Sequence, residues 1–240
     1  MGGVTVFPFH EACYGLLSRA IKGTIDNELI YSAFVRLSNE FETWMLDIDY
    51  GDPPPRDNRD WISVPGTELL VKNPAESIDM SPFLVQQAPA ALPCCEGCDS
   101  LSDPFNELPI EIRQQLMAQL PLLDISALRQ ASKIMFETLP SKTVWTRVLT
   151  ETMPWLWEMD DVLSRGEHHR LDLIQTIKKL QTQTEYSFDG INQCLTLANR
   201  RRVWSVCEQI AVEYKKLNYP TSAARKWIPK GDGCFELLCR

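Results

Sequence analysis

The chain is 240 residues long, with 44% apolar residues and a net charge of −8. This length supports one large domain or two small ones, and the apolar fraction excludes a largely disordered chain. The negative charge argues against a nucleic-acid-binding protein, because contacts to phosphate depend on Lys and Arg. Residues 1–103 carry a net charge of −10 and residues 104–240 a net charge of +2, so we expect a boundary between two parts near residue 103.

No stretch of about 18 consecutive apolar residues occurs, so we expect no transmembrane helix and no membrane partner. Eight cysteines are too few for a disulfide framework in a chain of this length. Cys13, Cys194 and Cys207 lie within helical patterns, and we expect them to be small buried apolar residues. These features predict a reducing compartment, either the cytoplasm or the nucleus.

Residues 1–72 are expected to form an N-terminal lobe of helices with a small β element. Apolar residues recur at helical spacing from residue 8 to residue 46, interrupted by a charged turn around Asp26. Because this lobe is acidic and the rest of the chain is slightly basic, we expect the lobe to fold back on the C-terminal helices.

The N-terminal lobe is predicted to end in irregular structure and short strands. Three consecutive prolines exclude a helix in the acidic segment 47–60. The apolar pieces 61–64 and 68–71 are separated by a Pro-Gly pair and are possible strands. Residues 73–103, rich in proline and small residues, are expected to be a linker.

From residue 104 the sequence predicts helices as far as about residue 219. In the first helix, four apolar residues follow one another at steps of four: Leu108, Ile112, Leu116 and Leu120. Pro109 suits its first turn, where a missing N–H costs nothing. Asp124 is a suitable N-cap for a second helix that extends to Met135, and Ser141 for a third.

Two further helices complete the prediction, with apolar stripes at Leu171, Ile174, Ile177 and Leu180 and at Val203, Val206, Ile210, Tyr214 and Leu217. The expected fold is therefore mainly α: N-terminal helices with a small β element, a three-helix segment, and further helices. Its expected parts are the lobe 1–72, the linker 73–103, the three-helix segment 104–149, a helical region 150–219 and an irregular tail 220–240.

The three-helix segment resembles the F-box. It begins with Leu108-Pro109-Ile110-Glu111-Ile112, has Leu123-Asp124-Ile125 at its centre, continues with Ala131-Ser132-Lys133, and reaches Trp145 about a dozen residues later. Several F-box positions therefore match in order. The segment covers about a fifth of the chain.

The flanking sequences resemble a large family of F-box proteins from filamentous fungi. The matching pieces are residues 7–13 (FPFHEAC), Trp61 with residues 65–74 (PGTELLVKNP), residues 153–158 (MPWLWE) and residues 199–204 (NRRRVW). Tyr14 and Leu69 stand where the family pattern has tryptophan and tyrosine. The similarity extends from about residue 7 to residue 219.

The resemblance implies that residues 104–149 are an F-box that binds a Skp-type adaptor, and through it a cullin, in an SCF-type ubiquitin ligase. The protein would be a substrate receptor or adaptor without catalytic residues, cofactor or metal. The implied contact or supporting residues are Leu108, Pro109, Ile112, Leu116, Leu120, Leu123, Leu128 and Trp145. Their apolar side chains exceed what one buried stripe needs, which is typical of a helix that buries a second face against a partner.

Two other functions stay open. A helical scaffold or interaction module could use the same three helices as an internal core and bind an unrelated protein. An enzyme in the N-terminal part is the least favoured, because its only candidate nucleophile is Cys13, three residues after His10, and no third orienting group is evident.

Other motifs are weak. Cys95 and Cys98 form a C-x-x-C pair, but zinc requires four ligands and a redox pair requires a strand before it, so a linker with reduced thiols is favoured. Asp47, Asp49 and Asp52 are half of a calcium loop and more typical of a solvated acidic loop.

Residues 200–202, three arginines, are a possible nuclear-localisation patch or partners for carboxylates. Trp155 and Trp157 are expected to cover the end of the F-box helices rather than bind a ligand.

Overall fold

The computed structural model describes residues 10–39, 42–51, 68–87, 103–185, 194–218, 226–229 and 235–238. The chain is mainly α, as predicted. It divides into two compact units. Unit 1 comprises Met1–Ala75, Tyr186–Ile191 and Leu195–Arg240, and unit 2 comprises Glu76–Glu185 and Asn192–Cys194.

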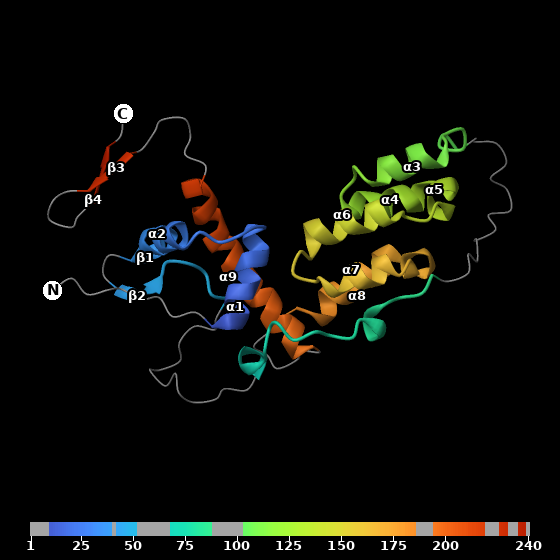
Figure 1. Cartoon of the computed structure of the whole chain (residues 1–240). Coiled ribbons are helices and arrows are strands. Elements are labelled where there is room, and N and C mark those ends of the chain that lie inside the picture. Colours follow the sequence, from blue (N-terminus) through green and yellow to red (C-terminus); the bar gives the residue numbers. More distant parts are fainter. Residues whose placement is uncertain are drawn as a thin grey trace. The chain divides into compact units, whose positions relative to one another are not determined.

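Unit 1 is built around its last helix. Helices α1 (Glu11–Ile21) and α2 (Asn27–Leu37) both pack against α9 (Leu195–Asn218), as Figure 1 shows. The predicted contact between N-terminal and C-terminal helices is therefore confirmed. The core of unit 1 is apolar. Its buried residues include Leu16, Leu17, Ala33, Phe34, Leu197, Val203, Ile210 and Tyr214. The hydrophobic effect, rather than the opposite net charges, accounts for this packing.

The turn between α1 and α2 explains where each helix ends. Lys22 adopts a left-handed conformation (φ 61°), which closes the C-terminus of α1. Asp26 is the N-cap of α2, because its Oδ1 accepts hydrogen bonds from the Glu28 and Leu29 N–H groups at 2.8 and 3.1 Å. The Asp26 N–H in turn donates to the Tyr214 hydroxyl at 3.0 Å, which joins the turn to α9.

The helical prediction for residues 8–46 is wrong beyond residue 37. There the chain forms an antiparallel pair of short strands, β1 (Ser38–Asn39) and β2 (Glu42–Leu46). Strand β2 contains Thr43 and Trp44, residue types that favour strands, and the apolar spacing in this part spans too few turns to favour a helix.

The strand predicted at residues 68–71 is also wrong, since they form the 3-10 helix η1 (Glu68–Val71). Side chains of α9 hold the chain that follows η1: Asn199 Nδ2 donates to the Lys72 carbonyl at 2.8 Å, and Arg200 Nε donates to the Pro74 carbonyl at 2.7 Å. Leu69 is fully buried. Hydrogen bonds to a helix thus replace the strand pairing that the sequence suggested. The other predicted strand, 61–64, lies outside the described residues.

The tail predicted as irregular contains a second antiparallel pair, β3 (Lys226–Pro229) and β4 (Phe235–Leu238). The intervening sequence includes Gly231, Asp232 and Gly233, residue types common in hairpin connections. The apolar residues of this segment show no periodicity, so the sequence did not predict its two four-residue strands.

Unit 2 is a bundle of short helices (Figure 1): α3 (Ile110–Met117), α4 (Leu122–Ala131), α5 (Lys133–Glu137), α6 (Lys142–Thr152), α7 (Glu158–Ser164), η3 (Glu167–Arg170) and α8 (Leu173–Gln183). The core of its first part consists of Met117, Ile125, Met135, Val144, Trp145 and Val148. Trp155, Leu156, Met159, Val162, Ile177 and Leu180 are buried in the second part. The segment expected to hold three helices therefore holds four, and the predicted region 150–219 is divided between the two units.

The extra helix arises at Ser132, which is extended (φ −129°, ψ 125°) and interrupts the predicted helix that was to reach Met135. Its hydroxyl accepts a hydrogen bond from the Met135 N–H at 3.0 Å and so caps α5. Asp124 is not the N-cap of α4, because the helix begins at Leu122 after Pro121 and Asp124 lies in the first turn. Ser141 caps α6 as predicted, with the Val144 N–H donating at 3.5 Å.

Residues 76–87, predicted as part of a linker, belong to unit 2. Figure 1 shows them alongside α7 and α8, and they include the 3-10 helix η2 (Ser81–Phe83). The Val85 N–H donates to Thr176 Oγ1 at 3.2 Å, and the Val85 carbonyl accepts from the Asp172 N–H at 2.9 Å. This segment was predicted as a linker because residues 73–103 are rich in proline and small residues, although Met80 and Phe83 within it are buried.

Arg200 is expected to be essential for the stability of unit 1. It is fully buried, so truncation to alanine removes both the packing of its stem and a charge-assisted hydrogen bond. We expect Arg200→Ala to lower the free energy of unfolding by about 2 kcal/mol or more. Chemical denaturation measures this, and the exposed neighbour variant Ser205→Ala serves as the control. Equal stability of Arg200→Ala and wild type would contradict the structural role.

His168 is expected to make unit 2 less stable in acid. It is buried, its Nδ1 has no hydrogen-bond partner among the described residues, and burial, assisted by His169 and Lys142, lowers its pKa. A histidine whose pKa is lower in the folded state contributes full stability above its unfolded pKa of about 6.5 and loses it as the pH falls. The protection factors of the α7 amides, which are exchange rates corrected for the pH dependence of intrinsic exchange, should fall between pH 7.5 and pH 5.5. His168→Phe should weaken this dependence, whereas His169→Gln should retain it.

Candidate functional site

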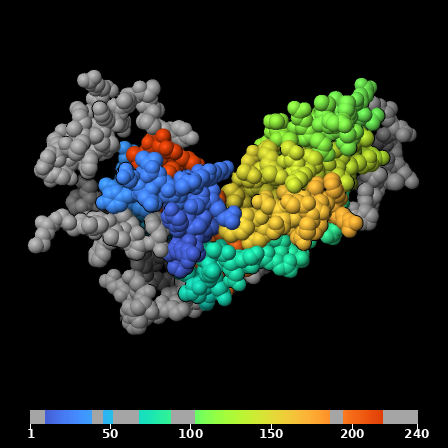
Figure 2. Space-filling model, in the orientation of Figure 1, coloured from blue at the N-terminus to red at the C-terminus, as the bar shows by residue number. Residues whose placement is uncertain are grey.

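The surface of unit 2 carries an apolar stripe on its first helices. We call Pro109, Ile112, Leu116 and Leu123 the α3–α4 surface. All four are exposed, and Leu123 retains 75% of its accessible area. Figure 2 shows the α3–α4 part of the chain, coloured green, at the surface. Isolated apolar residues on a surface are normal, but a group of them on adjacent helices is typical of an interaction site.

The geometry of α3 separates this stripe from the core. Successive residues of an α-helix are rotated by about 100°, so Ile112 and Leu116 lie one turn apart on the same side. Met117 is the buried residue of α3 and points to a different side. Helix α3 therefore presents apolar side chains both to the bundle and to the solvent.

Arginine side chains fix the chain on either side of α3. Arg147 of α6 donates through Nη1 to the Ala118 and Leu120 carbonyls at 2.6 and 2.9 Å, and it is paired with Glu151 at 2.8 Å. Arg113 Nε donates to the Leu108 carbonyl at 3.1 Å. These bonds satisfy carbonyls at helix ends that have no partner within a helix, and they hold the surface in one conformation.

Asp103 anchors the segment that leads into α3. Its Oδ2 accepts hydrogen bonds from Ser132 Oγ at 2.7 Å and from the Ile134 N–H at 3.1 Å, and its Oδ1 accepts from the Phe105 N–H at 3.0 Å. Burial opposes ionisation, but these hydrogen bonds outweigh it and hold the pKa of Asp103 below its usual value. The sequence analysis assigned Asp103 to the end of a linker. An aspartate followed by proline is common in proteins, so the sequence did not indicate that Asp103 anchors the segment before α3.

The eight predicted contact or supporting residues fall into three groups in the structure. Pro109, Ile112, Leu116 and Leu123 are exposed and form the α3–α4 surface; Leu108, Leu120 and Leu128 are half-buried; Trp145 is fully buried. The first group is available to a partner, whereas Trp145 packs inside the bundle and acts as support.

Three exposed apolar residues of unit 2 are absent from the predicted set. Ile110, Phe136 and Leu139 retain 53%, 41% and 38% of their accessible area. Ile110 opens α3, and the other two lie at the end of α5 and in the loop before α6. Periodicity could not identify them, because Phe136 and Leu139 flank a helix end.

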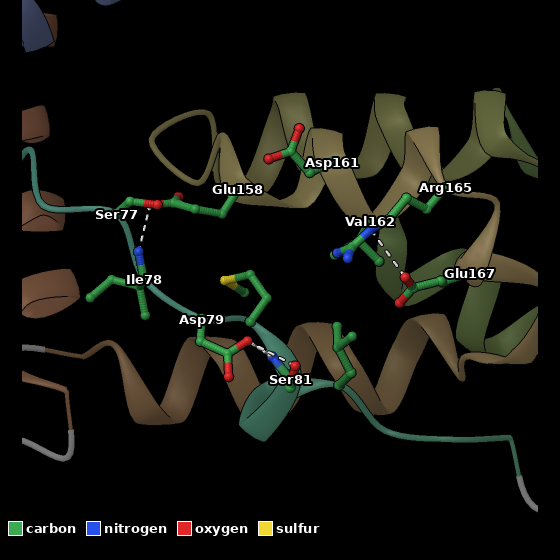
Figure 3. Close-up of a pocket in the computed structure, with 11 residues that line it drawn as sticks. Ser77, Ile78, Asp79, Ser81, Glu158, Asp161, Val162, Arg165 and Glu167 are labelled. Atoms are coloured by element: carbon green, nitrogen blue, oxygen red, sulfur yellow. Dashed lines mark hydrogen bonds and ion pairs between the residues drawn. The ribbon is translucent and has the colours of Figure 1, made fainter.

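The pocket of about 240 Å³ between residues 77–84 and α7 is polar (Figure 3). Four of its charged groups are engaged with neighbours: Glu158 Oε1 accepts from the Ile78 N–H at 3.3 Å, Asp79 Oδ1 accepts from Ser81, and Arg165 pairs with Glu167 at 3.1 Å. The hydrogen bonds from the Ser81 N–H and hydroxyl lower the pKa of Asp79. This arrangement holds residues 77–81 against α7.

Burial raises the pKa of two thiols of unit 1. For Cys13 this effect is opposed by the charge of Arg202, and for Cys207 the pKa rises to about 12. A raised pKa disfavours the thiolate, which is the nucleophilic form, so it does not support His10 and Cys13 as a catalytic pair. Cys207 is buried as predicted, whereas Cys13 and Cys194 are half-buried.

The remaining motifs carry no site in the described part of the chain. Cys95, Cys98 and Asp52 lie outside it, and within it no group of three or more His, Cys, Asp or Glu residues could hold a metal ion. Of the three arginines at residues 200–202, Arg200 donates to the Pro74 carbonyl and Arg202 Nη1 donates to the Tyr50 carbonyl at 2.8 Å. Trp155 is buried.

Comparison with known proteins finds no match: no family model, no curated protein and no solved structure is similar to this chain. Among the helices that the structure describes, none is long and apolar enough to cross a membrane.

Truncation of the buried Trp145 should destabilise unit 2 much more than truncation of the exposed Leu123. Trp145→Ala should reduce the free energy of unfolding of unit 2 by about 3–5 kcal/mol, because it leaves a cavity in the core. Leu123→Ala should change it by no more than about 0.5 kcal/mol, because the side chain is exposed. Urea denaturation followed by tryptophan fluorescence measures both, and similar losses for the two variants would contradict this distinction.

Proposed function

We propose that this protein is an F-box substrate receptor or adaptor of an SCF-type cullin–RING ubiquitin ligase. Residues 104–149 bind the Skp-type adaptor, and the α3–α4 surface is the principal contact. The observation that carries the proposal is the exposed apolar stripe of Pro109, Ile112, Leu116 and Leu123, which coincides with positions assigned to adaptor binding by the F-box resemblance.

The physics of the surface supports a tight protein interface. Burial of apolar area yields about 25 cal/mol per Å², and a few large side chains near the centre of an interface contribute most of the affinity. The hydrogen bonds of Arg113 and Arg147 keep the helix ends fixed, so little entropy is lost on binding.

The protein itself performs no chemistry in this proposal. It holds a target protein near the ubiquitin-conjugating enzyme and thereby raises the effective concentration of the target. Unit 1, which is a separate compact unit, is available to bind the target. The site of action is the cytoplasm or the nucleus, where ubiquitin ligases of this type operate.

A second candidate function is a helical scaffold that binds an unrelated protein. It is favoured by the continuation of the bundle beyond residue 149, because α6 packs against α7 and buries Val148 and Leu149. In this alternative the chain is a monodisperse monomer that does not bind the adaptor.

Adaptor binding tests the proposal directly. The full chain should co-purify with a purified Skp-type adaptor. The double variant Ile112→Gln, Leu123→Gln should weaken binding at least about tenfold, because each substitution removes an apolar side chain from the centre of the interface. Isothermal titration calorimetry gives the dissociation constants. The matched control is Val35→Gln, an apolar residue of α2 that is 51% exposed in unit 1.

Two results would overturn the proposal. Wild-type protein that does not bind the adaptor excludes the ligase function and leaves the scaffold. Undiminished binding by the double variant shows that the α3–α4 surface is not the contact.

A further inference from the structure

The polar pocket beside α7 has an excess of negative charge in its lining (Figure 3). Four carboxylates line it, those of Asp79, Glu158, Asp161 and Glu167, whereas Arg165 is the one cationic side chain among the described residues around it. Arg165 pairs with Glu167 at 3.1 Å, so these two charges offset each other. Three carboxylates remain, and a concave surface with a net charge of −3 attracts a cation.

Two of these carboxylates have oxygens available for a ligand. Asp161 is exposed, and no hydrogen bond or ion pair joins its carboxylate to another residue in the described part of the chain. Asp79 is also exposed, and both of its bonds from Ser81 go to Oδ1 rather than to Oδ2. These bonds lower the pKa of Asp79, so its carboxyl group is ionised at neutral pH. The buried Glu158, in contrast, accepts from the Ile78 N–H and holds the chain against α7.

The size of the pocket matches one side chain rather than a cofactor. Its volume is about 240 Å³. Pockets for drug-sized ligands are larger, at about 300–1,000 Å³, whereas a cavity of about 150 Å³ already holds a benzene molecule. Because Ser77, Asp79 and Asp161 of the lining are exposed, a side chain can enter from the solvent.

The chemistry of the lining favours arginine among cationic side chains. Met80 and Val162 also line the pocket and are buried, which gives it an apolar part beside the carboxylates. An arginine side chain has an apolar stem and a cationic head, so it can contact both parts. Its planar guanidinium bonds carboxylates through two parallel hydrogen bonds and is less strongly hydrated than the ammonium of lysine.

We infer that this pocket binds an arginine side chain of a partner protein, with Asp79 and Asp161 as the carboxylates that receive the guanidinium. The pocket lies outside residues 104–149, so the inference is independent of adaptor binding. It adds a binding site on the second half of unit 2, where the sequence patterns indicated none.

The test uses the isotope-labelled full chain and the peptide acetyl-Gly-Arg-Gly-amide, titrated at low salt and followed by NMR. We expect saturable shifts of the amides of residues 77–81 and 161–165. The matched control is the same peptide with citrulline in place of arginine, because citrulline has nearly the same shape and no charge. Its dissociation constant should be at least about fivefold higher, since a charged donor bonds a carboxylate more strongly. Salt at about 0.5 M should weaken binding of the arginine peptide, because it screens exposed charges.

A pair of variants separates the pocket from the general acidity of α7. Asp161→Asn keeps the shape and removes one charge, so it should raise the dissociation constant of the arginine peptide about threefold or more. Asp160→Asn removes the same charge from an exposed neighbour that does not line the pocket, and the constant should stay within about 1.5-fold. Thermal unfolding should be the same for both variants, because both side chains are exposed.

Three results would overturn the inference. Equal affinity for the citrulline peptide would show that the pocket does not recognise charge. Equal effects of Asp161→Asn and Asp160→Asn would show that the peptide binds elsewhere on the acidic surface. If methylguanidinium binds as tightly as the arginine peptide, the pocket takes a free small cation and the assignment to a partner protein is wrong. Each of these results leaves the proposed adaptor binding untouched, because none of these titrations contains the adaptor.

Discussion

The structure depends on side-chain donors that satisfy the backbone carbonyls at the ends of its short helices. Helices of five to eleven residues in unit 2 leave many of their carbonyls without a partner within the helix. Arg129 and Arg147 donate to three such carbonyls, at Ala118, Phe136 and Thr138. Arg113, Arg147 and Arg200 also donate to the carbonyls of Leu108, Leu120 and Pro74, which lie in the connections between helices.

This constraint has a functional consequence. Because arginine side chains fix the backbone, the apolar side chains of α3 and of the α5–α6 loop need not all turn inward. The core retains Met117, Ile125, Met135 and Trp145, while Ile112, Leu116 and Leu123 stay at the surface. A bundle that is ordered by polar bonds can thus keep apolar surface for a partner, which is what a docking module requires.

Sequence periodicity predicted the helices well where one face is buried, as for α1, α8 and α9. Periodicity gave the wrong secondary structure where contacts with other segments decide the local conformation. Glu68–Val71 became a 3-10 helix because Asn199 and Arg200 hold the chain that follows it, and residues 42–46 became a strand although Trp44 and Met45 fit a helical spacing. At the break, Ser132 caps α5 and also donates to Asp103, which lies 29 residues earlier, a contact that local periodicity could not indicate.

The sequence by itself determined that the chain is mainly α and that apolar residues around α3 exceed the needs of one buried stripe. It also predicted that the N-terminal lobe folds back on the C-terminal helices, but it gave opposite charge as the reason, whereas the contact with α9 is apolar. Only the tertiary structure decided which of those residues are exposed, that Trp145 is a support, and that Phe136 and Leu139 face the solvent. The reason is that periodicity reports the faces of one helix, whereas exposure depends on which neighbours cover each face. Neighbours in unit 2 can be distant in the sequence, since hydrogen bonds connect Asp103 with Ser132 and Val85 with Thr176, 29 and 91 positions apart.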